Sequence, residues 1–262
     1  MSDHHYHRVE DLTGAIVGGL GRSEGLTIDD LATADEFHLG GAAATTAIID
    51  ALGVGPTQRV LDIGSGLGGP ARRIATVTGC HVTGVDLTPS FVTAATDLSR
   101  LVGLDRQTDF RVGDATSLDL DGSFDAATVI HVGMNLPDKP AFFASVRDLL
   151  TTGGRLVVYD IMVTGDVHSV DYPMPFASSP DRAFLASPAE YGAALTAAGF
   201  VVGDPVDRTR LALDAAAAAG ANGPPLVSLA TVMGPEFSTM FANLGAALGD
   251  GVLAPIEIVA VR

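Results

Sequence analysis

The sequence predicts an α/β fold: a mainly parallel β-sheet with helices on both faces. From residue 59 onward, short apolar segments of strand character alternate with longer segments of helical periodicity. Capping residues and glycines bound the helical segments, as in the Ser-Pro-Ala-Glu stretch that begins at Ser187 and the stop at Gly199. Strands that alternate with helices at this spacing are joined by right-handed crossovers and pair in parallel.

Two helices are expected before the alternation begins. Residues 27–37 start at the capping-box pattern Thr27-Ile28-Asp29-Asp30, and residues 41–52 end before Gly53 and Pro56. The expected strands are 60–63, 81–87, 109–112, 124–130, 155–162, 200–204 and the final segment PIEIVAVR, residues 255–262. The expected later helices are 70–79, 88–103, 138–150 and 187–198.

Composition limits the class of protein. The chain has 262 residues, of which 47% are hydrophobic, enough for one large domain with additions around a full core. The net charge of −16 argues against nucleic acid or an anionic membrane as a partner, because both require basic patches. No apolar run reaches the roughly 18 residues that span a bilayer. The first twelve residues are polar and carry no apolar signal segment, so we expect a cytoplasmic protein.

No metal site is expected. The single cysteine, Cys80, excludes a disulfide framework and a cysteine-rich zinc site. His4, His5 and His7 stand beside Asp3 and have ligand character, but such a cluster is typical of a flexible terminus.

Candidate site residues follow the ends of the expected strands. Ligands of parallel α/β sheets bind beyond the carboxyl ends of the strands, at the point where the strand order reverses. The positions that follow strands are residues 64–68, Asp86, Asp114, His131 and Asp160. We expect these positions to share one edge of the sheet.

The stretch VLDIGSGLGGPARRIA, residues 60–75, places a glycine-rich turn between a strand and a helix. Gly64, Gly66 and Gly69 fit a dinucleotide-binding pattern, which is weak without context. Asp62 distinguishes a dinucleotide from a cationic ligand, because a carboxylate beside the ligand repels a pyrophosphate and suits a cation. S-adenosylmethionine carries a sulfonium and an ammonium and no phosphate. Arg72 and Arg73, which begin the following helix, are interpreted as a solvated helix face.

Two further carboxylates complete the cofactor prediction. Asp86, at the end of the second strand, is placed to accept hydrogen bonds from two ribose hydroxyls, a role it would serve equally in enzymes that bind NAD. Asp114, in the segment VGDAT, is placed to accept a hydrogen bond from an adenine amino group.

Five segments together resemble the class I S-adenosylmethionine-dependent methyltransferases. They are VLDIGSGLGG, VTGVDLTPSFV, FRVGDATSLDL, FDAATVIHVGMNLPDK and LLTTGGRLVVYDIM, in that order over residues 60–162. They look most like the small-molecule branch that includes ubiquinone/menaquinone, sarcosine/dimethylglycine and natural-product methyltransferases.

This resemblance implies a Rossmann-like sheet of seven strands whose last strand is antiparallel. It also implies S-adenosylmethionine as the cofactor and a set of contacts to it. The implied cofactor-binding residues are Asp62, Gly64, Ser65, Gly66, Gly68, Asp86, Leu87, Asp114, Ala115 and His131.

The acceptor site lies outside the matched segments. In this family it is built from N-terminal helices and late insertions, which here implies an N-terminal helical cap, residues 1–52, and a core, residues 53–262, with a lid segment 163–187 and a helical insert 210–251. The candidate substrate-binding residues are Tyr6, Asp160, Tyr172 and Phe176. Phe237, Met240, Phe241 and Leu244 recur at helical spacing in the insert, a pattern more typical of core than of pocket. If this stripe faces the site, Met233, Met240 and the phenylalanines would suit an apolar acceptor.

His131 and His38 are the candidate catalytic residues. His131 is either a general base or acceptor-orienting group, or a pocket wall that touches only the cofactor. His38, in DEFHLGG, is either a gate over the cofactor or a histidine packed in the cap.

The leading function is methyl transfer to an oxygen or nitrogen atom of a small, fairly apolar acceptor by direct displacement. Alternatives are an NAD(P)-dependent oxidoreductase and a non-catalytic cofactor-binding protein. The oxidoreductase is disfavoured by Asp62 and by the absence of a Tyr-x-x-x-Lys pair, since Lys139 is the only lysine. The oligomeric state is not predicted.

Overall fold

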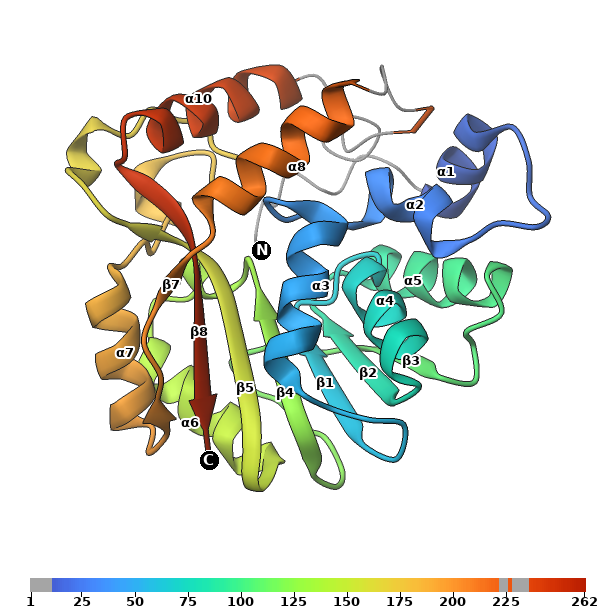
Figure 1. Cartoon of the computed structure of the whole chain (residues 1–262), viewed down its shortest axis with the longest axis horizontal. Coiled ribbons are helices and arrows are strands. Elements are labelled where there is room, and N and C mark those ends of the chain that lie inside the picture. The colour runs from blue at the N-terminus through green and yellow to red at the C-terminus, as the bar shows by residue number, and fades with distance from the viewer. Residues whose placement is uncertain (1–10, 222–225, 228–235) are drawn as a thin grey trace.

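The computed structural model describes residues 11–221, 226–227 and 236–262. They form an eight-stranded sheet of order β3-β2-β1-β4-β5-β8-β6, in which the short β7 pairs with β8 (Figure 1). The strands are β1 Arg59–Ile63, β2 His81–Asp86, β3 Thr108–Val112, β4 Phe124–Ile130, β5 Leu150–Val163, β6 Val201–Val202, β7 Val206–Asp207 and β8 Leu253–Val261. The first five strands are parallel, and β8 runs antiparallel to β5, β6 and β7.

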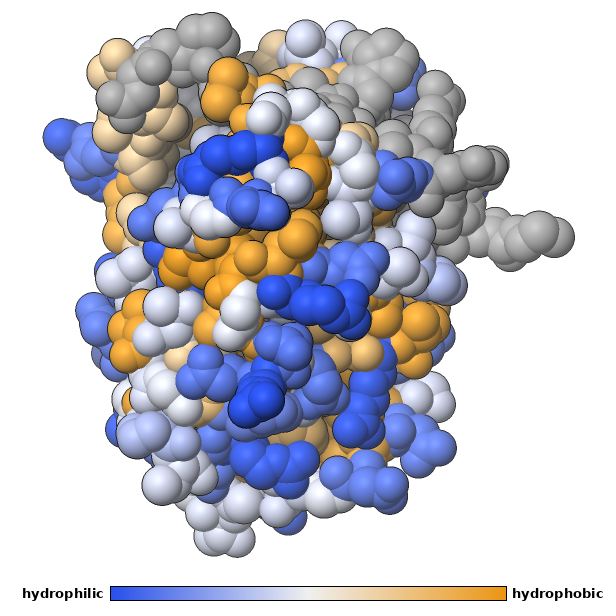
Figure 2. Space-filling model, turned by 90° about the vertical axis from the view of Figure 1, so that its right-hand side faces the viewer, coloured by the Kyte–Doolittle hydropathy of each residue, from blue (hydrophilic) through white to orange (hydrophobic). Residues whose placement is uncertain are grey.

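Helices cover both faces and one end of the sheet. The helices are α1 Leu12–Leu20, α2 Ile28–Asp35, α3 Gly41–Leu52, α4 Gly69–Thr78, α5 Pro89–Leu101, α6 Lys139–Leu149, α7 Pro188–Ala197, α8 Thr209–Ala221 and α10 Phe237–Gly249, with 3-10 turns η1 Gly133–Asn135, η2 Val167–Ser169 and η3 Pro180–Arg182. In Figure 1, α1, α2, α8 and α10 lie at the end of the molecule toward which the parallel strands point. Apolar side chains gather toward the same end of the face in Figure 2, whereas its lower half is mostly hydrophilic.

Two hydrophobic cores sandwich the sheet because side chains alternate along each strand. In β1, Val60 packs in the core under α3 and α4, and the next residue, Leu61, packs in the core under α6 and α7. Both faces are buried, which explains why the central strands are almost continuous apolar runs in the sequence.

The α/β class, the mostly parallel sheet and the antiparallel last strand are confirmed, but the sheet has eight strands and not seven. Of the expected strand over 200–204, only β6, Val201–Val202, is formed, and the short strand β7, Val206–Asp207, follows beyond it. Pro205 stands between them and has no N–H to donate to the sheet. The amide of Gly203 still donates to the carbonyl oxygen of Val259, at 2.8 Å.

The first expected helix ends two residues early. The capping box of Thr27 and Asp30 is present, but α2 ends at Asp35, and Glu36 leaves the helix with φ −101° and ψ 79°. The Glu36 carboxylate is buried and accepts hydrogen bonds from Thr45 of α3 and Arg73 of α4. These tertiary contacts hold the chain out of the helix. The next helix, α3, has the expected bounds and ends at Gly53, which has φ 60°.

Among the residues that the structure describes, no helix is both long enough and apolar enough to cross a membrane.

Candidate active site

A cavity of about 370 Å³ opens beyond the carboxyl ends of the parallel strands, beside the point where β1 lies between β2 and β4. Its polar end is formed by the glycine-rich loop after β1 and the turns after β2 and β3, and its other walls are mostly apolar. The predicted site residues that line it are His38, Asp62, Gly64, Ser65, Gly66, Asp86, Leu87, Asp114, Ala115, His131 and Phe176.

The glycine-rich loop is tightly folded against its neighbours. Gly64 has φ 75°, and a Cβ atom there would lie 2.2 Å from Cγ2 of Val132. The amides of Gly64 and Ser65 both donate to the carbonyl oxygen of Val85 at the end of β2, at 2.7 and 3.0 Å. The loop therefore needs glycine at position 64, and its backbone stands at the cavity wall where a ligand can approach closely.

Asp86 fastens this loop to the turn after β2. Its carboxylate accepts hydrogen bonds from the amides of Gly66 and Thr88, both at 2.9 Å. A carboxylate has about four lone-pair sites, so it can accept several donors at once. Asp86 thus shapes the loop as well as lining the cavity.

Asp62 is a buried carboxylate with unmet hydrogen-bonding capacity. It is 1% exposed, and its Oδ1 accepts a hydrogen bond of 2.7 Å from the Thr128 hydroxyl of β4. Among the described residues, its Oδ2 and the Oγ of Ser65 have no hydrogen-bond partner. Burial raises the pKa of Asp62 to about 6, the Thr128 hydrogen bond lowers it and the charge of Asp86 raises it. A cationic ligand beside it would stabilise the ionised form.

The adenine side of the expected site is more open. Oδ1 of Asp114 accepts hydrogen bonds from the amide and the hydroxyl of Thr116, at 2.8 and 2.7 Å. These bonds fix the carboxylate at the cavity edge. Ala115 lies beside it, and Leu87 is 51% exposed, so an apolar ring could cover that side chain. Taken together, the glycine loop, the underbonded Asp62 and the two outer carboxylates fit S-adenosylmethionine.

Gly68, a predicted cofactor-binding residue, does not line the cavity. It begins α4 with φ 79°, and a Cβ atom there would lie 2.6 Å from Cζ of Phe110 and 2.9 Å from a guanidinium nitrogen of Arg72. Gly68 therefore allows close packing behind the loop.

Arg72 and Arg73 are not a solvated helix face. Arg72 is fully buried and donates to Asp35 of α2 at 2.6 Å and to the carbonyl oxygen of Leu67 at 2.5 Å. Arg73 donates to the buried carboxylate of Glu36 at 2.6 Å. Helical periodicity did not reveal the burial of these two arginines, because Asp35 and Glu36, which cover them, come from a distant part of the chain.

His131, His38 and Tyr159 form an aromatic cluster at the cavity wall. The ring of His131 is stacked on Tyr159 with an interplanar angle of 5° and a centroid distance of 5.6 Å, and the His38 ring centroid lies 6.1 Å from that of His131. Among the described residues, His131 is the only one other than glycine with a positive φ, 55°, and its buried Nε2 has no hydrogen-bond partner there. Burial, and then the charge of His38, holds the pKa of His131 well below its ordinary value.

His38 is buried and held by α3. Its Nε2 lies 3.0 Å from the carbonyl oxygen of Gly41 and 3.1 Å from the Thr45 hydroxyl. Burial lowers the pKa of His38 to about 4, although the hydrogen bond with Gly41 raises it. Both imidazoles are therefore neutral at neutral pH.

Of the predicted substrate-binding residues Tyr6, Tyr172 and Phe176, only Phe176 is seen to line the cavity. Tyr6 lies outside the described residues. Tyr172 packs against the core cluster of Met134, Met174 and Leu253 without lining the cavity. Phe176 does line it, together with Pro175 of the same segment.

Asp160 also lies behind the cavity wall and not in it. Its Oδ2 accepts hydrogen bonds from the Tyr191 hydroxyl at 2.8 Å and from the amide of Met134 in η1 at 3.2 Å. Burial raises the pKa of Asp160 to about 7, against the hydrogen bond from Tyr191 and the charge of Lys139. Because Met134, Asn135 and Leu136 line the cavity, Asp160 supports this part of the wall.

Sequence reasoning missed most of the apolar wall. The cavity-lining residues that were not singled out for it include Phe37, Leu39, Phe91, Ile130, Val132, Met134, Asn135, Leu136, Ile161 and Pro175. Phe241 and Leu244 also line the cavity, although their helical spacing favoured a core position. Their periodicity identified the apolar face of α10 correctly. Only the fold shows that this face covers the cavity. Met233 lies outside the described residues.

Comparisons with known proteins agree with this geometry. Residues 61–158 match the family model described as a methyltransferase domain. A sterol 24-C-methyltransferase of Gibberella zeae is 35% identical over 121 residues, which span 46% of this chain and 32% of the relative. Methyltransferase GfsG of Streptomyces halstedii is 33% identical over 142 residues, which span 54% of this chain and 51% of that protein.

The fold is also that of a solved methyltransferase. The geranyl diphosphate C-methyltransferase of Streptomyces coelicolor, in complex with Mg²⁺, geranyl-S-thiolodiphosphate and S-adenosylhomocysteine, has a TM-score of 0.66 and 21% identity, over 84% of this chain and 79% of that one. The chain spans between about a third and a half of the length of the two curated relatives.

Replacement of Asp86 by Ala is expected to weaken S-adenosylhomocysteine binding by at least about tenfold. The change removes a charged acceptor that fastens Gly66, and hydrogen bonds to charged groups contribute about 1.5–3 kcal/mol each. Calorimetry gives the dissociation constant. Asp86→Asn keeps one acceptor oxygen and should lie between Asp86→Ala and the wild type. Asp105→Ala, an exposed site, controls for the lost charge and should bind normally. An unchanged affinity in Asp86→Ala would contradict the placement of Asp86.

The raised pKa of Asp160 predicts a pH-dependent stability. The folded chain retains a proton up to about pH 7, whereas the unfolded chain releases it near 3.8. This contribution to stability is therefore complete at low pH and is lost as the pH rises through 7. Asp160→Asn has no such proton and can still accept from Tyr191. From pH 5 to pH 8, the unfolding free energy of the wild type should fall relative to Asp160→Asn by about 2–3 kcal/mol. Urea titrations at both pH values measure this, and a constant difference would refute it.

Proposed function

Because the chain belongs to the class I S-adenosylmethionine-dependent methyltransferases, we propose that it transfers a methyl group from S-adenosylmethionine to a small, predominantly apolar acceptor. The observation that carries the proposal is the lining of one cavity. Its wall combines the glycine loop and three carboxylates with two neutral histidines and apolar side chains from η1, the segment after β5 and α10. Such a cavity can hold a cationic cofactor and an apolar acceptor side by side.

The residues that would hold the cofactor divide by chemistry. Asp62 and the loop of Gly64 and Gly66 would bind the charged amino-acid part, Asp86 the ribose and Asp114 the adenine. When bound, S-adenosylmethionine supplies a methyl group on a sulfonium, which is already a good leaving group. The chain therefore needs to contribute mainly alignment of the acceptor and exclusion of water.

Residues distant in the sequence would exclude water from the acceptor. Phe37 comes from the N-terminal segment, Phe176 from the segment after β5, and Phe241 and Leu244 from α10. This distribution supports the proposed division into an N-terminal cap, residues 1–52, a lid segment, 163–187, and an insert, 210–251, around a core.

His131 is the proposed group that acts on the acceptor. It follows β4, next to β1 in the sheet, so it stands at the cavity wall beside the glycine loop. A neutral imidazole can accept a proton or a hydrogen bond. Because its pKa is low, His131 accepts a hydrogen bond more readily than it holds a proton. His38 packs against it and is the second candidate.

Oxygen or nitrogen is the proposed acceptor atom, since these carry the proton that a neutral histidine could receive. The names of two similar proteins specify carbon methylation, which makes a carbon acceptor the competing possibility. We also propose a cytoplasmic location and no nucleic-acid partner, supported by the net charge of −16 and the single, buried cysteine.

The cofactor part of the proposal is tested by calorimetry with S-adenosylhomocysteine and NADH. Binding of S-adenosylhomocysteine with no signal from NADH is expected, because the carboxylate of Asp62 beside the glycine loop opposes a pyrophosphate. Tight binding of NADH alone would favour an oxidoreductase. Binding of S-adenosylhomocysteine without methylation of any metabolite in a mass-shift screen would favour a non-catalytic binding protein.

His131→Asn is expected to lower turnover by about 10²–10⁴-fold, the usual contribution of a general acid or base, while S-adenosylhomocysteine binding stays nearly intact. Asparagine tolerates a positive φ, so this variant removes the imidazole without adding the backbone strain that His131→Ala adds. Steady-state kinetics and calorimetry measure the two effects. A parallel loss of affinity and turnover would make His131 a cofactor-pocket wall. No loss of either would direct the search to His38, Tyr6 or Asp160, or to transfer without a base.

A further inference from the structure

We propose that the methyl acceptor carries no negative charge, and that this site rejects acceptors with a phosphate, diphosphate or carboxylate group. The inference rests on the proposed function and names the substrate class of the same cavity. It follows from a charge inventory of the cavity wall and of every basic residue near it.

The only charged side chains at the cavity wall are acidic, among the residues that the structure describes. They are Asp35, Asp62, Asp86 and Asp114, and no lysine or arginine joins them. Asp35 is paired with Arg72, and the buried Oδ2 of Asp62 has no hydrogen-bond partner among the described residues. S-adenosylmethionine has one net positive charge, which Asp62 would balance, so no surplus positive charge is left for an anionic acceptor.

The basic residues nearest the cavity are already engaged. Arg72 donates to Asp35, to the Ser99 hydroxyl and to two carbonyl oxygens, and Arg73 donates to Glu36 and Asp29. Nζ of Lys139 donates to the carbonyl oxygens of Leu136 and Phe184, at 3.1 and 2.5 Å, and its charge faces Asp160. None of the three can turn to a ligand without leaving a buried partner unpaired.

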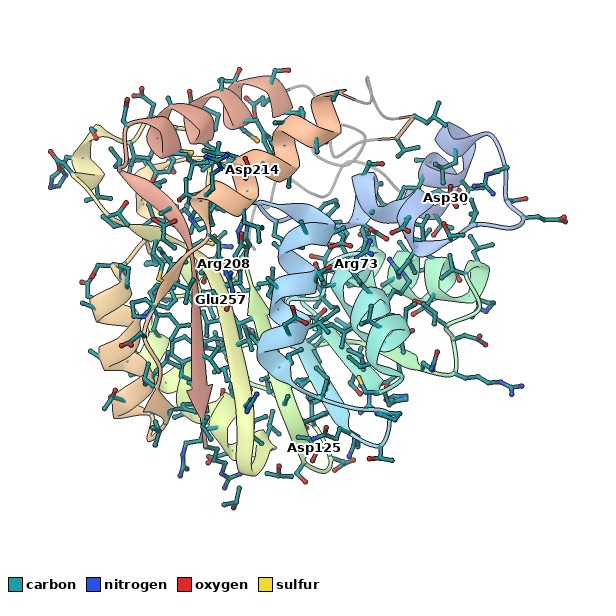
Figure 3. All side chains as sticks on the ribbon, in the orientation of Figure 1. Asp30, Arg73, Asp125, Arg208, Asp214 and Glu257 are labelled. Carbon is teal, nitrogen blue, oxygen red and sulfur yellow. The ribbon has the colours of Figure 1, made fainter. Side chains whose placement is uncertain are left out.

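None of the remaining described lysines or arginines lines the cavity. Arg208, which precedes α8, and Glu257 of β8 point toward one another and are joined at 2.9 Å (Figure 3). Arg210 pairs with Asp214 on the exposed surface of α8. The one lysine or arginine outside the described residues is Arg8.

The histidines do not supply the missing charge. Burial keeps the pKa of His38 near 4 and that of His131 well below its ordinary value, so both rings are neutral at neutral pH. A metal bridge would be the other way to hold a phosphate. Among the described residues, no group of three or more histidine, cysteine, aspartate or glutamate side chains is arranged to bind a metal ion.

The acceptor end of the cavity would bury an anion without a partner. Leu136, Ile161, Phe176, Phe241 and Leu244 line it, and Asn135 is the only amide side chain at the wall among the described residues. An unpaired anion is costly to transfer from water to such surroundings, whereas a hydroxyl needs one hydrogen bond from Asn135 or a histidine.

Matched acceptor pairs test the proposal. Geraniol is compared with geranyl diphosphate, and 1-naphthol with 1-naphthyl phosphate and 1-naphthoate, for binding to the full chain saturated with S-adenosylhomocysteine, with and without Mg²⁺. At least about a tenfold preference for the uncharged member is expected, because juxtaposed like charges are strongly unfavourable. Equal or tighter binding of an anionic member, with or without Mg²⁺, would overturn the proposal. So would failure of every uncharged member to bind while S-adenosylhomocysteine binds. Failure to bind S-adenosylhomocysteine would instead contradict the proposed function.

Two variants make the test independent of the natural acceptor. Asn135→Arg places a cation at the wall and should improve binding of the anionic members at least about tenfold relative to the matched control Asn135→Gln. No improvement, with S-adenosylhomocysteine affinity retained, would show that missing positive charge is not what excludes anions. Arg8→Gln should leave the preference unchanged. If anionic members bind the wild type and lose that binding in Arg8→Gln, Arg8 supplies the cation and the proposal is wrong.

Discussion

The buried guanidinium of Arg72 is the contact on which the site depends most. It comes from α4 and reaches Asp35 of α2, the carbonyl oxygen of Leu67 in the glycine loop, and Ala95 and Ser99 of α5. One side chain thus joins the N-terminal segment, the loop and a helix on the sheet. Removing one partner of such a buried pair typically costs about 3–5 kcal/mol, because the other charge is left uncompensated. The position of the loop and of the segment that carries His38 is therefore coupled to a single interaction.

Electrostatics divides the cavity into two chemically different ends. At one end, Asp62, Asp86 and Asp114 concentrate negative charge around backbone that glycine leaves accessible. At the other end, burial keeps His38 and His131 neutral among apolar side chains. This division suits the proposed binding of a cationic cofactor at the first end and of an acceptor without negative charge at the second. The transfer of a methyl group from a sulfonium needs little more than this division and a fixed distance between the two ligands.

Local patterns were sufficient to predict most of the elements and to place the candidate cofactor-binding residues at the ends of strands. The strand–helix alternation, the capping boxes and the glycine turns are set by neighbouring residues, so α3 and β4 have the expected bounds. The cofactor end could be predicted because its residues follow strand ends, and the fold brings these ends together. Asp86 was placed correctly at the cavity, although its bonds to the loop depend on where Gly66 comes to lie.

The acceptor end could not be predicted in the same way. Its wall combines residues from the N-terminal segment, η1, the segment after β5 and α10, and their proximity depends on tertiary packing. Tertiary packing also buries Arg72 and His38, and it places Asp160 and Tyr172 behind the cavity wall. Arg72 pairs with Asp35 and Asp160 accepts from Tyr191, and no local periodicity identifies partners that lie so far away in the sequence.

A crystal structure of the chain with S-adenosylhomocysteine would test the central claim most directly, that one cavity holds the cofactor at its carboxylate end and leaves the apolar end free for an acceptor. The account predicts the ribose at Asp86, the adenine beside Asp114, the amino-acid part along Gly64 and Gly66, and the sulfur directed toward the His131 side of the cavity. Binding elsewhere, or a ligand that fills the apolar end and leaves the glycine loop uncontacted, would contradict it.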